Sequence, residues 1–241
     1  MADGMSVASA GLVPSKTTCP RRCIGAVTPE RQRRARMKRM RRTLLNSCRM
    51  LKHQRHGFRD KWKMVTLTYR PGCDWKPSDV RDYLNRVRKW CARRRWHFAY
   101  LWVMELHKSG VPHYHVLIRI PYSGTLPKSD QIGWWVNGIT NTVTAKNAIG
   151  YLAKYASKGT EHGDFPKGAR IHGAAGLTRE SRLYVAFWNL PVWLRDQLSG
   201  PIRTIRLRGG FVVPSTGEFL PTPYEVEIVG GVPLIYLKKD Q

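Results

Sequence analysis

Acidic residues are scarce in this sequence. Its 241 residues include 16 Asp and Glu against 42 Lys and Arg, which gives a formal net charge of +26. A chain this basic repels itself and needs a polyanionic partner. Because phosphates accept many weak contacts at once, nucleic acid is the partner that we expect.

Long apolar runs and paired cysteines are also missing. No stretch approaches the roughly 18 apolar residues that a membrane-spanning helix needs, and SVASAGLVP near the start is too short for the core of a secretion signal. The five cysteines are odd in number, and only Cys19 and Cys23 are closely spaced, so we expect free thiols rather than disulfides or a zinc site. We therefore expect a cytoplasmic protein that does not contact a membrane.

The hydrophobic fraction of 42% is enough for one core. Period-two and helical patterns predict an α+β fold, in which a central antiparallel sheet is flanked by helices and followed by C-terminal β-hairpins. The expected elements are a strand at 63–70, a helix at 77–94 capped by Ser78, a hairpin at 98–106 and 113–121, a helix at 144–158, a loop at 160–178, a strand at 183–188, a short helix at 191–198 and Gly-Gly hairpins beyond residue 201.

We expect three regions: a basic N-terminal arm or helix over residues 1–60, the main domain over 61–200, and a β extension over 201–241 that can belong to the main domain. In the first region, eight of the twelve residues from 31 to 42 are basic, and Met37, Met40 and Leu44 give the run a weak helical stripe. We favour a helix that orders on DNA over a disordered arm. The candidate phosphate contacts are Arg31, Arg33, Arg34, Arg36, Lys38, Arg39, Arg41 and Arg42.

The sequence VMELHKSGVPHYHVLI predicts a metal site on the hairpin. His113 and His115 lie two residues apart on a strand, so both imidazoles point to one face. Centring the turn near Ser109 places Glu105 beside His113 on that face. Two imidazoles and one carboxylate suit Mn²⁺, Mg²⁺, Zn²⁺ or Fe²⁺, and His107 can replace Glu105 or orient a ligand. The plainer alternative is a strand with a polar, solvent-facing side.

The helix GYLAKYASKG carries two tyrosines, each followed three residues later by a lysine. Tyr151 and Tyr155 lie ~40° apart round a helix, and Lys154 and Lys158 flank them. A phenol beside an ammonium group can attack a phosphodiester when a metal polarises the phosphate. Taken alone, the pattern is equally typical of an amphipathic helix with aromatic residues at its margin.

The order of three blocks, TLTY, then the His-Tyr-His strand, then YLAKYASK, resembles the HUH endonuclease superfamily. The two tyrosines make it similar to the rolling-circle replication initiators of single-stranded DNA phages and some plasmids. The resemblance spans roughly residues 63–160. It implies Mg²⁺ or Mn²⁺ held by Glu105, His113 and His115, with Tyr151 and Tyr155 as nucleophiles and Lys154 and Lys158 beside them.

The resemblance also implies partners and a reaction. The protein would nick and rejoin single-stranded DNA at a replication origin through a 5′-phosphotyrosine. Because no G-x-x-x-x-G-K-[ST] segment is present, we expect a host helicase and a host polymerase to complete replication. The alternatives are a non-catalytic basic DNA-binding protein and a transposase of the single-tyrosine branch. Conjugative relaxases fit less well, since their tyrosine precedes the histidines.

Overall fold

The computed structural model describes residues 22–54, 59–107, 110–158, 165–166 and 168–238. The chain forms two compact units: the larger runs from Pro29 to Thr222, and the smaller joins the segment up to Thr28 with the segment from Pro223. These limits differ from the boundaries expected near residues 60 and 200. Within the described ranges, no helix has the length and hydropathy to cross a bilayer.

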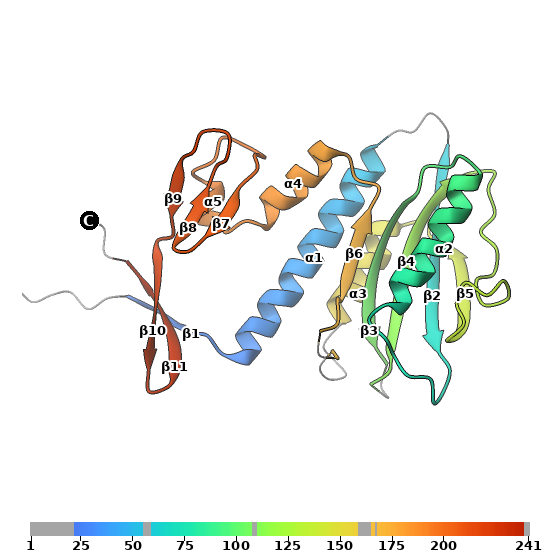
Figure 1. The fold of residues 1–241 in the computed structure, drawn as a ribbon, viewed down its shortest axis with the longest axis horizontal. Coiled ribbons are helices and arrows are strands. Elements are labelled where there is room, and N and C mark those ends of the chain that lie inside the picture. Colours follow the sequence, from blue (N-terminus) through green and yellow to red (C-terminus); the bar gives the residue numbers. More distant parts are fainter. Residues whose placement is uncertain (1–21, 55–58, 108–109, 159–164, 167, 239–241) are drawn as a thin grey trace, which may run out of the picture. The chain divides into compact units, whose positions relative to one another are not determined.

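A five-stranded antiparallel sheet forms the centre of the larger unit, with strand order β5-β2-β4-β3-β6 (Figure 1). It is flanked by helices, so the α+β fold expected from the sequence is confirmed. Its strands are β2 (Asp60–Tyr69), β3 (Ala99–Leu106), β4 (Pro112–Pro121), β5 (Gly138–Thr144) and β6 (His172–Ala175).

Helix α2 (Asp79–Arg93) covers one face of the sheet. Its expected apolar side is confirmed, and those residues are buried together with Trp90. Ser78 precedes the helix, but its side chain makes no capping hydrogen bond, so that expectation is wrong. The next residue, Asp79, instead fixes this end, because its carboxylate accepts hydrogen bonds from the Tyr69 hydroxyl at 2.7 Å and from the Lys76 amide at 3.0 Å.

Helices α1 (Pro29–His53) and α3 (Ala148–Lys158) lie on the opposite face from α2 (Figure 1). The expected basic helix is present as α1, and it packs on the larger unit through buried Met40, Leu44, Cys48 and Leu51. This apolar stripe recurs every three or four residues, which explains why the helix is docked without DNA. The expectations that it orders only on DNA or is a loose arm are therefore wrong.

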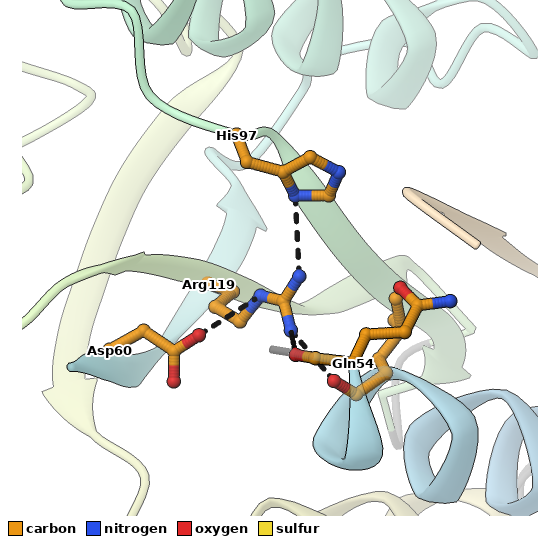
Figure 2. A network of polar contacts seen from close by, with 5 residues as sticks. Gln54, Asp60, His97 and Arg119 are labelled. Carbon is orange, nitrogen blue, oxygen red and sulfur yellow. Dashed lines mark hydrogen bonds and ion pairs between the residues drawn. The ribbon is translucent and has the colours of Figure 1, made fainter. Parts of the chain in front are cut away.

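Arg119 ties the end of α1 to the sheet (Figure 2). Its guanidinium is almost fully buried and donates to the carbonyl oxygens of Leu51 at 2.7 Å and Gln54 at 3.2 Å, and it lies 3.4 Å from the Asp60 carboxylate and 3.2 Å from Nδ1 of His97. The last carbonyls of a helix have no partner within the helix, and a cation suits their partial negative charge. Arg119 thus stabilises the helix end and holds it against β4.

Two assignments between residues 160 and 190 are wrong. The apolar run Leu183–Trp188 forms part of helix α4 (Arg179–Asn189) rather than a strand. Its helix begins where Thr178 accepts a hydrogen bond from the Ser181 amide at 3.2 Å, which is a typical N-cap. The stretch expected to be a loop up to residue 178 contains β6, which pairs with β3 at the sheet edge.

The expected Gly-Gly hairpins are present. In the larger unit, α5 (Val192–Arg195) precedes a small antiparallel sheet of β7 (Ile205–Leu207), β8 (Gly210–Val212) and β9 (Phe219–Pro221). In the smaller unit, β10 (Tyr224–Val229) and β11 (Val232–Leu237) pair with each other, and β11 also pairs with β1 (Cys23–Ala26). Gly230 and Gly231 both have positive φ, of 57° and 79°, which a tight hairpin turn requires.

Candidate metal and tyrosine site

Strands β3 and β4 bring together the three residues expected to bind metal. Glu105 lies directly opposite His113 in the antiparallel register, and His115 lies opposite Val103. All three side chains therefore share one face of the sheet. Oε2 of Glu105 lies 2.7 Å from Nε2 of His115, and both side chains are mostly buried. The hairpin register inferred from the sequence is confirmed.

The surroundings of His113 favour a neutral imidazole. Burial lowers the pKa of His113, the nearby His107 and His115 lower it further, and Glu105 acts in the opposite direction. The ring of His107 stacks on that of His113, with centroids 5.1 Å apart and planes inclined by 9°. A neutral imidazole offers the lone pair that a metal ion needs.

Thr66 is a contact that the sequence reasoning did not assign. It lies opposite His115 in the register between β2 and β4, and its Oγ1 is 3.3 Å from Nδ1 of His115. A hydroxyl can donate or accept a hydrogen bond, so it suits either tautomer of the ring. The alternation of TLTY, which places Thr66 and Thr68 on one face, was the signal that could have found it.

The donor set has the right chemistry for a divalent cation. Two imidazoles and one carboxylate on a shared face are suitable ligands for Mn²⁺, Zn²⁺ or Fe²⁺, and a carboxylate also suits Mg²⁺. Within the described residues, however, no three His, Cys, Asp or Glu side chains are gathered closely enough to hold an ion. The Glu105–His115 contact occupies two donor atoms, so His113 would have to approach it for metal to bind.

Helix α3 carries the candidate nucleophiles on the same side of the sheet. It packs against β3 and α1, and α1 is bonded to Arg119, whose side chain shares the face of His113 and His115. Tyr151 is half-buried against the core, and Lys154 is exposed. The side chains of Tyr155 and Lys158 lie outside the described residues. The helix begins later than expected, because Asn147 accepts a hydrogen bond from the Gly150 amide at 2.9 Å.

The basic side chains of α1 divide into two groups. Some hold the helix in place: Arg36 donates to the Ala169 carbonyl at 2.6 Å, Arg42 donates to the Trp188 carbonyl at 2.9 Å, and Arg34 pairs with Glu30. The others lie along its exposed surface: Arg31, Arg33, Lys38, Arg39 and Arg41. A groove of about 430 Å³ beside the helix is lined by residues that include Arg36, Arg39 and Arg170. This surface has the charge that a phosphate backbone requires.

The fold and the histidine face together define a class of protein in which an antiparallel sheet presents polar ligands beside a tyrosine-bearing helix. Residues 62–160 match the family model of the replication-associated protein ORF2. No curated protein and no solved structure matches the chain. The match covers less than half of the chain, but it includes Glu105, His113, His115 and helix α3. It supports a replication-associated protein of the rolling-circle type that acts on DNA.

Proposed function

We propose that this protein initiates rolling-circle replication by nicking and rejoining single-stranded DNA at an origin. The observation that carries the proposal is the convergence of Glu105, His113 and His115 on one face of the sheet, in a segment that matches a replication-associated family. The wider functional context is the two-tyrosine form of the HUH superfamily, acting in the cytoplasm with a host helicase and polymerase.

Glu105, His113 and His115 would hold Mg²⁺ or Mn²⁺. When bound, such an ion polarises the scissile phosphate as a Lewis acid and orients it. The carboxylate contributes a negative charge to the ligand set, and the two imidazoles are neutral donors. Thr66 would fix the orientation of the His115 ring through Nδ1, as partners of metal-bound histidines commonly do.

Tyr151 is the proposed nucleophile, with Tyr155 as its counterpart one turn later. The phenol oxygen forms a bond to phosphorus, the bond from phosphorus to the 3′ oxygen breaks, and the phenol loses its proton as the leaving 3′ oxygen gains one. The products are a 5′-phosphotyrosine and a free 3′-hydroxyl. Lys154 and Lys158 would stabilise the negative charge that develops during attack. The reverse reaction rejoins the strand, and two phenols allow the DNA end to pass between them.

A library of randomised single strands tests this function without knowledge of the origin. The protein is incubated with the library and Mn²⁺, and strands that stay attached under denaturing conditions are recovered and sequenced. We expect a 5′ adduct on α3, located by mass spectrometry, that disappears with EDTA and in the Tyr151→Phe/Tyr155→Phe variant. Tyr122→Phe, at an exposed tyrosine outside α3, is the matched control and should form the adduct normally.

The same experiment decides against two alternatives. If strands bind but never become attached to the wild-type protein, the chain is a non-catalytic DNA-binding protein, which the exposed basic surface of α1 would explain. If the adduct forms on one tyrosine and the other Tyr→Phe variant retains every activity, including repeated rounds of replication, the chain works as a single-tyrosine enzyme.

A further inference from the structure

A second cavity lies on the sheet face opposite to the histidines. It measures about 490 Å³ and lies between α2 and the strands β3 and β6. Tyr100 and Trp102 line it from β3, at the positions that alternate with Val103 and Glu105, so they point away from the histidine face. The cavity is therefore separate from the candidate metal site.

The cavity is floored by aromatic rings. Phe98 and Tyr100 lie with centroids 5.1 Å apart and planes inclined by 45°, and Trp102 lies deeper and is almost fully buried. The hollow exists because β6 has small residues on this face. A Cβ atom at Gly173 would collide with the Trp102 indole, and Ala175 also lines the space. Partly exposed rings above a buried apolar floor form a surface on which a planar group can stack.

Basic side chains surround this floor. Arg81 and Arg88 come from α2, and Arg170 comes from the segment before β6. Arg170 and Arg88 both lie close enough to Tyr100 to lower the pKa of its hydroxyl, against the larger raising effect of burial. No acidic residue lines the cavity in the described part of the chain. The cavity therefore combines a site for an aromatic ring with a site for an anion.

We propose that this cavity binds one nucleotide of a single DNA strand, with its base stacked on Phe98 and Tyr100 and a phosphate held by Arg88 and Arg170. The volume is within the range of about 300–1,000 Å³ typical of small-molecule sites. Base stacking on aromatic side chains beside basic residues is the general mode of single-strand binding. This site goes beyond the proposed nicking reaction and does not require it.

A strand fits the surroundings better than a free nucleotide. Arg170 lines both this cavity and the basic groove beside α1, which also includes Arg36 and Arg39. A strand whose phosphates follow the groove would reach the cavity at the β6 edge of the sheet. A free nucleotide would have no use for the continuous basic surface.

Photo-crosslinking locates the bound base directly. Single strands of deoxythymidine with one 5-iodouracil are bound to the full-length protein in EDTA, which prevents cleavage, and are then irradiated. We expect peptides that contain Phe98 and Tyr100 to carry the nucleotide. If adducts form only on other segments, such as α1 or β4, the proposal is wrong. Because no cleavage is involved, this failure would leave the proposed nicking function untouched.

Paired substitutions on α2 separate the site from general charge. Arg88 lines the cavity, whereas Arg93 is exposed on the same helix and does not line it, and both changes to Gln remove one positive charge. We expect Arg88→Gln and Tyr100→Leu each to weaken binding of a five-nucleotide strand about ten-fold, and Arg93→Gln to weaken it much less. Equal losses in the two arginine variants, with no loss in Tyr100→Leu, would overturn the proposal.

The free-nucleotide alternative has its own measurement. Thymidine monophosphate is added in excess over the strand, and the yield of the Phe98–Tyr100 crosslink is followed. A strand site predicts that the monophosphate competes at least about ten-fold more weakly than the five-nucleotide strand, since it has one phosphate instead of several. Equal competition would show a pocket for a free nucleotide and would overturn the assignment to a DNA strand.

Discussion

Glu105 contacts His115 rather than the histidine directly opposite to it. Its register partner is His113, yet Oε2 lies 2.7 Å from Nε2 of His115. An ionised carboxylate can only accept a hydrogen bond, so Nε2 of His115 carries a hydrogen in this arrangement. Metal binding through that nitrogen must replace the contact and move the hydrogen to Nδ1, where Thr66 can accept it.

The charge of Glu105 is the first test of this reasoning. Glu105→Gln keeps the size of the side chain but removes its negative charge, so we expect Mn²⁺ affinity to fall by about 10- to 100-fold or more. Titration followed by the electron paramagnetic resonance signal of free Mn²⁺ measures the loss. Glu218→Gln, at an exposed carboxylate elsewhere, should bind Mn²⁺ as the wild type does. Unchanged affinity in Glu105→Gln would remove Glu105 from the ligand set.

Thr66 should affect the metal site without touching the metal. Thr66→Val keeps the shape of the side chain and removes the hydroxyl that lies 3.3 Å from Nδ1 of His115. We expect Mn²⁺ affinity to fall about ten-fold, as for other partners of metal-bound histidines. Restoration by Thr66→Ser, measured in the same titration, would assign the effect to the hydroxyl. A loss that serine does not restore would indicate a packing effect instead.

Thr142 on β5 provides the matched control for that substitution. Its hydroxyl is buried and has no hydrogen-bond partner among the described residues. Removal of an unpaired buried hydroxyl costs little or stabilises the fold. Thr142→Val should therefore leave both Mn²⁺ affinity and the free energy of unfolding unchanged or slightly raise the latter. Urea denaturation checks the second part.

The hairpin and α2 could be predicted because their patterns follow local rules. The turn between β3 and β4 is short, so the chain itself sets the register that places Glu105 opposite His113. In α2 the residues Val80, Leu84 and Val87 recur at helical spacing and all are buried. Such elements need no knowledge of distant neighbours.

Strand β5 and helix α4 could not be recognised in this way. In β5, Ile139 is 68% exposed while Thr140 is 7% exposed, which inverts the usual pattern. The reason is distant in sequence, since the Asp130 carboxylate accepts hydrogen bonds from the Thr140 hydroxyl and amide. In α4 the β-branched and aromatic residues of LYVAFW favour a strand, but the Thr178 cap and contacts with α1 favour a helix.

The Arg119 network gives a prediction about stability. Arg119→Met would leave the Asp60 carboxylate and the carbonyl oxygens of Leu51 and Gln54 without their donor (Figure 2). We expect the free energy of unfolding to fall by about 2–4 kcal/mol. The exposed Arg34–Glu30 pair is the control, and Arg34→Met should change it by less than about 0.5 kcal/mol. Equal effects in urea denaturation would contradict the structural role of Arg119.

His172 on β6 should make the fold sensitive to acid. Burial lowers the pKa of His172 to about 4, and the positive charges of Arg170 and Arg36 lower it further, so the folded protein keeps this ring neutral. Its Nδ1 has no hydrogen-bond partner in the part of the chain that the structure describes. The unfolded chain binds a proton near the ordinary pKa of about 6.5, so stability falls by about 1.4 kcal/mol per pH unit between there and pH 4. We expect His172→Gln to lose this component, so that the wild type loses about 1–2 kcal/mol more than the variant between pH 7 and pH 5 in urea denaturation. His53→Gln, at an exposed position in the last turn of α1, should follow the wild-type profile. Parallel profiles for the wild type and His172→Gln would show that another group causes the acid sensitivity.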